Sequence, residues 1–426
     1  MSRLSLPVLA IILACTPFGA GIAHAQRGDA GTVVTAGTAV SGRLADSAAS
    51  PTPQPPRARP WYERLSLRGY TQVRYNRLLE TNPDLTCPQC DRSIGRGGGF
   101  LVRRARLVLS GDVSDRVSVY IQPDFATEVS GTLHLGQIRD AYFDLFLDRG
   151  KTFRLRVGQS KVPFGWENLQ SSSNRLPLDR ADPLNSALPN ERDLGVFAYW
   201  APEKIRQRFR TLTDSGLKGT GDYGLVGVGA YNGQTANRPE ANSSLHTVLR
   251  VSYPFRLANG QFIEVGVQGY TGRFVIPSGN RTEGVTGASE FRDERAAVTL
   301  VVYPQPFGLQ AEWNVGQGPE VDPAARNIDT RGLEGGYVQA MYRAQFAGQT
   351  LTPFIRGQRY EGGKKLETDA RSYRMRELEV GAEWLPIAAF ELTAMYTISD
   401  RRYEDAENPV NRQRGQLLRL QAQFNY

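Results

Sequence analysis

Arginines occur inside otherwise apolar, strand-like stretches of this sequence. The clearest stretch is FLVRRARLVLS (100–110), which carries Arg103, Arg104 and Arg106. An unpaired arginine is rarely buried in an apolar core, because removing its charge from water is too costly. Guanidinium groups bind phosphates and carboxylates through paired N–H donors. Arginines that recur along one face of a strand therefore indicate a face that meets water or charged partners. Their number alone does not define an attraction of anions.

Motifs for catalysis or for cofactor binding are weak or absent. The segment GTGDYG (219–224) matches GxGxxG, but an alternating stretch, LVGVGAYNG, follows it instead of the helix that a phosphate site requires. No GxSxG, HExxH, Walker A or EF-hand pattern occurs. His134 and His246 leave a hydrolase as a distant alternative. We predict no enzyme activity, no cofactor and no metal.

Two cysteines, Cys87 and Cys90, are spaced as CPQC. In an exported protein this spacing favours a local disulfide. A redox-active pair and half of a metal site are the alternatives. His134 and His246 lie far from the two cysteines in the sequence, which gives a zinc site little support.

The N-terminus predicts export. Arg3 precedes an apolar stretch (6–14), and Ala23-His24-Ala25 then forms a small-x-small cleavage site, so we predict a signal peptide over 1–25. A lipoprotein signal ending at Cys15 is the alternative. The next segment, 26–60, consists largely of Gly, Ala, Thr, Ser and Pro, and is predicted to be a flexible periplasmic linker.

Composition excludes some classes of protein for the remaining segment, 61–426. The 426-residue chain has a formal net charge of +8, but its lysines and arginines are scattered and match no nucleic-acid-binding motif. We therefore expect no nucleic-acid partner. No internal run of eighteen apolar residues occurs, which argues against a helical membrane protein.

The dominant period after residue 64 is two, which is typical of strands with unlike faces. In the last segment Leu418, Leu420 and Phe424 share one face, whereas Arg419 and Gln421 lie on the other. Sixteen such segments occur, most of them long enough to cross a membrane as tilted strands. They are 64–76, 100–112, 116–126, 136–148, 151–161, 194–202, 221–232, 244–254, 260–272, 291–303, 307–316, 332–345, 349–361, 372–385, 388–401 and 411–426.

The connections between these segments alternate in length. Short turns such as SGDVSD and DRGK follow most even-numbered segments, and longer loops follow the odd-numbered ones. This alternation predicts an all-β transmembrane antiparallel barrel with its short turns in the periplasm. One connection, 201–219, breaks the rule and is predicted to form a short helix or a hairpin extension. Apolar-face aromatic residues near the short turns fit a membrane-interface girdle. They are Phe153, Tyr253, Trp384, Phe390 and Tyr426.

Alternation also assigns charged side chains to the inside of the barrel, where a water-filled lumen would solvate them. The inward basic residues are predicted to be Arg68, Arg74, Arg104, Arg106, Arg154, Arg156, Arg250, Arg343, Arg356 and Arg419. The inward acidic residues are predicted to be Asp124, Asp140, Asp144, Glu264, Glu312, Glu377, Glu379, Glu383 and Glu391. The same alternation places Arg103 on the lipid-facing side, at the extracellular rim.

The third long connection (161–193) is predicted to fold inward and narrow the channel, since loops of this length are usually functional or disordered. A surface loop stabilised by ion pairs is the alternative. Its basic side chains are Lys161, Arg175, Arg180 and Arg192, and its acidic side chains are Glu167, Asp179, Asp182, Glu191 and Asp193.

Several stretches resemble the phosphate-selective porin O and P family. They include LRGYTQVRYN (67–76), FLVRRARLVLSGDVSDRVSVYIQPDF (100–125), IRDAYFDL (138–145) and LRVGQSKVPFGWENLQSSS (155–173). The resemblance implies a sixteen-stranded, trimeric outer-membrane channel whose wall arginines and constriction lysines attract phosphate. Arg104, Arg106, Arg154 and Arg156 match the arginine-bearing strands of that family, and Lys161 matches its GQxKxPF motif. Tyr426 stands where the family usually ends in Phe.

We therefore predict an outer-membrane porin for passive diffusion of small solutes, with anions such as phosphate preferred. The expected partners are small anionic or polar solutes, outer-membrane lipid and lipopolysaccharide, and two further copies in a homotrimer. The alternative is a non-conducting barrel that serves as an adhesin or scaffold.

Overall fold

The structure is a computed structural model that describes residues 60–129 and 132–426. The predicted signal peptide, and all of the predicted linker except Pro60, lie outside the described residues. No helix in the described ranges is long and apolar enough to cross a membrane.

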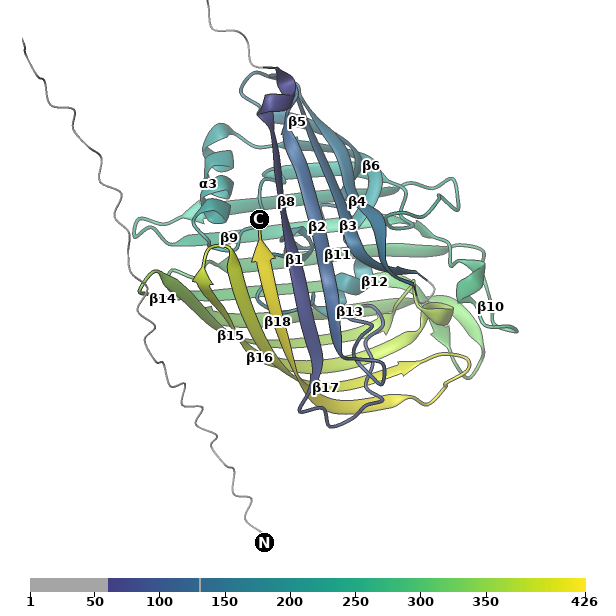
Figure 1. Ribbon diagram of the computed structural model, residues 1–426. Coiled ribbons are helices and arrows are strands. Elements are labelled where there is room, and N and C mark those ends of the chain that lie inside the picture. The colour runs from purple at the N-terminus through teal and green to yellow at the C-terminus, as the bar shows by residue number, and fades with distance from the viewer. Residues whose placement is uncertain (1–59, 130–131) are drawn as a thin grey trace, which may run out of the picture. The chain divides into compact units, whose positions relative to one another are not determined.

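The described chain forms one closed antiparallel sheet, in which β1 pairs with β2 on one side and with β18 on the other. Figure 1 shows this closure, with the purple β1 beside the yellow β18. The spanning strands are β1 (Leu65–Leu78), β2 (Phe100–Asp112), β3 (Val117–Val129), β4 (Thr132–Phe146), β5 (Phe153–Lys161), β6 (Arg192–Trp200), β7 (Val226–Tyr231), β8 (His246–Arg256), β9 (Phe262–Phe274), β11 (Phe291–Val302), β12 (Phe307–Asp322), β13 (Asn327–Tyr342), β15 (Gln349–Gly363), β16 (Ser372–Ile387), β17 (Phe390–Glu404) and β18 (Arg412–Asn425).

Two further strands are short and do not span the barrel. β10 (Thr286–Gly287) pairs with β13 in parallel, and β14 (Ala344–Phe346) pairs with the start of β15. The predicted sixteen-stranded antiparallel barrel is thereby confirmed. The helices are η1 (Trp61–Arg64), α1 (Trp166–Leu169), α2 (Asp182–Ala187), α3 (Glu203–Asp214), η2 (Ser278–Asn280) and η3 (Thr368–Ala370).

Period-two alternation orients the side chains as the sequence predicts. In β18 the side chains of Arg419, Gln421 and Gln423 are buried on the inner face, whereas Leu420 and Phe424 are exposed on the outer face. The outer face buries apolar surface only when lipid surrounds the barrel, which is the arrangement of a transmembrane barrel. The long loops mark its extracellular end and the short turns its periplasmic end.

A β-bulge in β2 corrects the orientation predicted for Arg103. Gln72 of β1 pairs with Arg104, but the next residue, Val73, pairs with Val102, so Arg103 is an extra residue on the bulged strand. A bulge resets the alternation of the strand. Arg103 therefore faces inward like Arg104, and it donates a hydrogen bond to the carbonyl oxygen of Cys90 at 2.9 Å. The prediction that Arg103 faces lipid is wrong.

Candidate pore constriction

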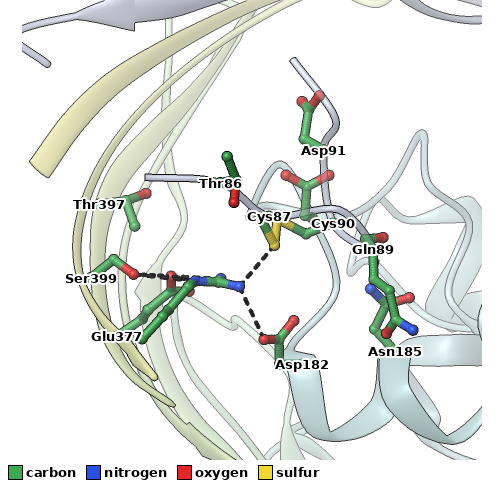
Figure 2. The surroundings of a disulfide bond; sticks show 12 residues. Thr86, Cys87, Gln89, Cys90, Asp91, Asp182, Asn185, Glu377, Thr397 and Ser399 are labelled. Atoms are coloured by element: carbon green, nitrogen blue, oxygen red, sulfur yellow. Dashed lines mark hydrogen bonds and ion pairs between the residues drawn. A yellow bond between two sulfur atoms is a disulfide. The ribbon is translucent and has the colours of Figure 1, made fainter. Parts of the chain in front are cut away.

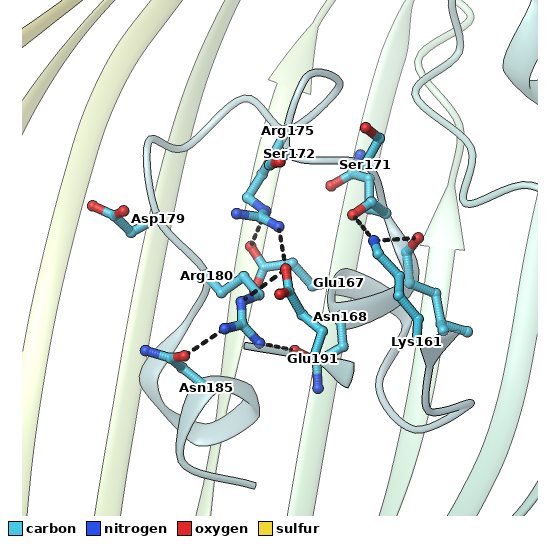
Figure 3. Close-up of polar contacts among 12 residues, drawn as sticks. Lys161, Glu167, Asn168, Ser171, Ser172, Arg175, Asp179, Arg180, Asn185 and Glu191 are labelled. Carbon is cyan, nitrogen blue, oxygen red and sulfur yellow. Dashed lines mark hydrogen bonds and ion pairs between the residues drawn. The ribbon is translucent and has the colours of Figure 1, made fainter. Parts of the chain in front are cut away.

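Loop 3 (162–191) connects β5 to β6 and lies inside the barrel, where nearly all of its residues are buried. Its apolar residues Phe164 and Leu184 pack with Tyr270 and Tyr337 of the barrel wall. The ring centroids of Phe164 and Tyr270 are 4.9 Å apart in an edge-to-face arrangement. Loop 3 thus packs against the wall through a small apolar cluster. Figure 3 shows loop 3 beside the barrel strands.

A cluster of basic side chains surrounds one carboxylate of loop 3. The Glu191 carboxylate lies 3.0 Å from Arg192, 3.4 Å from Arg180, 3.5 Å from Arg139 and 3.8 Å from Arg175. Burial alone would raise the pKa of Glu191, but these guanidinium groups hold it well below its usual range. Glu191 is therefore ionised, and it neutralises only part of the charge around it. Figure 3 shows Arg175 and Arg180 pointing toward Glu191.

Lys161 lies at the end of β5, beside this cluster. Its ammonium group donates hydrogen bonds to the carbonyl oxygens of Leu169 and Gln170, at 3.0 and 2.7 Å. Within the described ranges no carboxylate forms an ion pair with Lys161. Its positive charge is therefore oriented by backbone dipoles of loop 3 and is not directly neutralised.

Three wall arginines converge on a second carboxylate of loop 3, Asp179. Arg419 lies 2.5 Å from this carboxylate, Arg74 lies 3.2 Å from it, and Arg103 lies 3.6 Å from it. The fourth arginine at this level, Arg356, donates to the Asp179 carbonyl oxygen at 2.9 Å. Arg74, Arg356 and Arg419 face inward as predicted, and Arg103 joins them through the bulge in β2. All four anchor loop 3 to the wall.

The remaining wall arginines predicted from the sequence differ in the groups that they contact: some pair with a carboxylate, and others donate to uncharged oxygen atoms. Arg106 lies 2.7 Å from the Asp124 carboxylate, and Arg156 lies 2.8 Å from that of Asp144. Arg104 donates only to the side-chain oxygen of Gln72, at 2.7 Å. The contacts of the others are Arg154 to the Asp222 carbonyl oxygen at 2.6 Å, Arg250 to Glu264 at 3.1 Å and Arg68 to the Ser110 hydroxyl at 3.0 Å. Among the described residues, Arg104 thus has no carboxylate within ion-pair distance.

All nine acidic residues assigned to the lumen are buried on the inner face. One of them, Glu312, accepts hydrogen bonds from the backbone N–H groups of Trp166 and Glu167, at 2.6 and 2.8 Å. It therefore fixes the start of α1 to β12. Arg343, in contrast, lies between β13 and β14 and is not on a spanning strand.

A disulfide joins Cys87 to Cys90 in loop 1 (79–99). The Arg401 guanidinium on β17 donates to Cys87 Sγ at 2.9 Å and lies 3.2 Å from Asp182 of α2. Asn185, also in α2, donates to the Gln89 carbonyl oxygen at 2.9 Å. Figure 2 shows the disulfide between β17 and α2, so loop 1 also folds into the lumen and packs on loop 3.

Comparison with known proteins identifies the architecture. The family model described as phosphate-selective porin O and P matches residues 84–426. This chain belongs to that family. No curated protein sequence matches it.

Solved outer-membrane porins share the fold at low sequence identity. The porin is similar to the outer-membrane channel DcaP of Acinetobacter baumannii (14% identity, TM-score 0.52) and to OmpF of Salmonella typhi in complex with daunomycin (12%, 0.53). Each match covers 85% of this chain and 97% of the other chain. An anion-selective porin from Comamonas acidovorans matches at 8% identity and a TM-score of 0.50, over 85% of this chain and 99% of the other. These structures share the fold of this chain, and its membership of the porin family makes it a passive diffusion channel of the outer membrane.

Arg139 is a member of the basic cluster around Glu191 that alternation did not reveal. Gln122 of β3 pairs with Asp140, but the next residue, Pro123, pairs with Ile138, so Arg139 is the extra residue of a second bulge. Arg139 and Asp140 therefore both face the lumen. The signal in the sequence was Pro123, because proline in a strand interior often marks a bulge.

The long connection between β6 and β7, here called the exit segment (201–225), forms the helix α3 at the periplasmic end (Figure 1). Of the two predicted alternatives, the structure therefore has the helix. Its apolar residues Ile205 and Phe209 pack with Trp166 of loop 3 and with Tyr303 after β11. This apolar cluster links the exit segment to loop 3.

The exit segment also crosses the periplasmic mouth of the lumen. The Lys218 ammonium lies 2.6 Å from the Glu383 carboxylate on β16. The exit segment starts at β6 and ends at β7. Around the barrel, six spanning strands lie between β7 and β16 in one direction, and seven lie between β6 and β16 in the other. The ion pair therefore joins opposite walls. The side-chain amide of Gln170 donates to the Lys218 carbonyl oxygen at 2.8 Å. Loop 3 and the exit segment are therefore in contact inside the barrel, and the exit segment lies at its periplasmic end.

Proposed function

We propose that this porin preferentially conducts small anions, with phosphate as the model solute, and that loop 3 forms its constriction. The observation that carries the proposal is the excess of positive charge around Glu191. Five cations meet three carboxylates there, which leaves two positive charges in excess. The cations are Lys161, Arg139, Arg175, Arg180 and Arg192, and the carboxylates are Glu191, Asp140 and Glu167.

The physical mechanism is electrostatic focusing in a narrow aqueous path. Low-dielectric walls concentrate the field of fixed charges into the lumen, which raises the local concentration of ions of opposite sign. Arg104 and Lys161, which have no carboxylate within ion-pair distance in the described ranges, supply the cations that a passing anion can pair with. Arg74, Arg356 and Arg419 support the constriction indirectly, because they anchor loop 3.

Export and assembly belong to the same proposal. The features that support export by a cleaved signal peptide are Arg3, the apolar stretch 6–14 and Ala23-His24-Ala25. Membership of the porin family supports a homotrimer in outer-membrane lipid and lipopolysaccharide. Crosslinking of the purified porin in detergent tests the trimer, and N-terminal sequencing of the exported protein tests cleavage after Ala25.

Reversal potentials in planar bilayers test the anion preference. Under a tenfold KCl gradient the parent porin should give the sign of a chloride-preferring channel, and added phosphate should reduce the chloride current. Lys161→Gln should shift the reversal potential toward potassium. The matched control is Arg149→Gln, an exposed charge in the turn between β4 and β5, which should leave the potential unchanged. A potassium-preferring parent channel would contradict the proposal, and absence of conductance would favour the non-conducting barrel.

A further inference from the structure

The lipid-facing side of β15–β18 carries two rows of arginines near its extracellular end. Strand register places Arg374, Arg402 and Arg412 opposite one another on β16, β17 and β18. One step closer to the membrane centre, Arg376, Asp400 and Arg414 form the second row, which Arg359 of β15 extends. We call these six arginines the arginine rows. Their side chains lie outside the lumen, and that of Arg414 is 62% exposed.

The charge of the arginine rows is only partly neutralised within the chain. Asp400 lies 2.8 Å from Arg412 and 3.0 Å from Arg414. The other carboxylates are Glu361, which pairs with Arg374 and Arg359, Glu404, which pairs with Arg402, and Glu334, which pairs with Arg359. Six guanidinium groups thus meet four carboxylates, and no carboxylate in the described ranges forms an ion pair with Arg376. Like charges on adjacent strands destabilise a sheet unless an anion lies between them.

An apolar groove continues from the arginine rows toward the membrane centre. Its lining includes Arg376, Arg414 and the Asp400 carboxylate at the level of the second row, and Leu378 and Ile398 on the same two strands as Arg376 and Asp400. Leu378 and Ile398 are 40% and 41% exposed, so the outer surface changes from basic to apolar along the length of one groove. The surface therefore offers phosphate-binding groups at the level of lipid head groups and apolar surface at the level of acyl chains.

We propose that the arginine rows and this groove form a binding site for a phosphorylated glycolipid of the outer leaflet. The guanidinium groups contact the phosphates of the head group, because arginine binds phosphate through paired N–H donors. One acyl chain lies in the groove against Leu378 and Ile398. A surface that faces the membrane meets lipid, whereas free anions pass on the other side of the wall. The site rests on the proposed location in outer-membrane lipid with lipopolysaccharide, and it is independent of the proposed anion preference.

Native mass spectrometry of the full-length porin in detergent tests this site, with bisphosphorylated lipid A as the probe and dephosphorylated lipid A as the comparison. The parent porin should retain the bisphosphorylated form preferentially. The variant Arg376→Gln/Arg414→Gln should retain it about tenfold less, since two charge-assisted phosphate contacts are lost. The matched control, Arg64→Gln/Arg149→Gln, removes two exposed arginines that lie outside the spanning strands at the periplasmic end and should retain lipid A like the parent.

Bilayer conductance of the same variants separates this proposal from the proposed function. Both double variants should keep the conductance and ion preference of the parent, because Arg376 and Arg414 lie on the outer face and Arg64 and Arg149 lie outside the spanning strands. This result also shows that the barrels are folded. Equal retention of the two forms of lipid A by the parent would overturn the proposal. Equal retention of lipid A by both double variants would do the same. If Arg376→Gln/Arg414→Gln instead dissociates an oligomer without losing lipid A, the surface is a contact between copies and the proposal is wrong.

Discussion

Replacing Asp179 by asparagine removes the carboxylate that joins loop 3 to three wall arginines. Burial alone would raise the pKa of Asp179, but Arg74, Arg419 and Arg103 hold it well below its usual range, so the group is ionised at neutral pH. Removing one partner from a buried charge network costs about 3–5 kcal/mol, because the remaining charges are left without compensation. The arginines are on rigid strands, so this loss should act mainly on the attachment of loop 3.

The substitution also adds one net positive charge to the lumen. A unit charge about 7 Å from an ion in water changes the energy of that ion by about 0.6 kcal/mol, which is close to RT. The local anion concentration should therefore rise about threefold. Asp179→Asn should accordingly shift the reversal potential in a KCl gradient toward chloride. The single-channel current should also become noisier as loop 3 moves.

Limited proteolysis and bilayer recording together measure both effects. Asp179→Asn should be cleaved within loop 3 at a protease concentration that leaves the parent intact. The matched control is Asp115→Asn, which alters an almost fully exposed carboxylate 3.6 Å from Arg64. Exposed pairs of this kind contribute about 0–1 kcal/mol, so this control should match the parent in both assays. Unchanged proteolysis and unchanged reversal potential in Asp179→Asn would refute the anchoring role of Asp179.

Three further perturbations test other parts of the lumen. Glu191→Gln should shift the reversal potential toward chloride, because it removes the carboxylate shared by the arginines of the proposed constriction. A shift toward potassium would contradict the proposed excess of positive charge there. Lys218→Met should lower the free energy of unfolding by about 3–5 kcal/mol, because the buried Glu383 carboxylate loses its cation. It should also increase conductance, because the exit segment detaches from β16. Denaturant titration measures the first effect and bilayer recording the second, and an unchanged conductance would contradict a role of the exit segment in conduction. Burial would raise the pKa of Asp91, but Arg74 and Arg103 lower it to about 2. The ionised Asp91 therefore stabilises the folded barrel fully above about pH 4, and about 2 kcal/mol of the free energy of unfolding is lost as the pH falls toward 2. Asp91→Asn should flatten this acid dependence of the free energy of unfolding.

Alternation predicted the barrel because one face of each strand meets lipid and the other meets a polar lumen. This local pattern does not contain the bulges that turn Arg103 and Arg139 inward. A bulge depends on how two strands pair, and only Pro123 marked one of them in the sequence. The anchoring contacts were even less accessible to prediction. Arg419 and Asp179 form an ion pair across 240 positions of the sequence, and nothing in either local pattern indicates that partner.

The number of inward arginines is therefore a poor guide to the ion preference of this channel. Arg74, Arg103 and Arg419 share the carboxylate of Asp179, so their charges stabilise loop 3 more than they attract solutes. Arg104 differs from its neighbours because it faces only the uncharged Gln72. Charges that have no partner in the described wall or loops act on a passing ion at full strength, whereas paired charges largely cancel at the same distance. The selectivity of the lumen should thus respond more to Arg104→Gln than to Arg106→Gln, although both residues lie on the same face of β2.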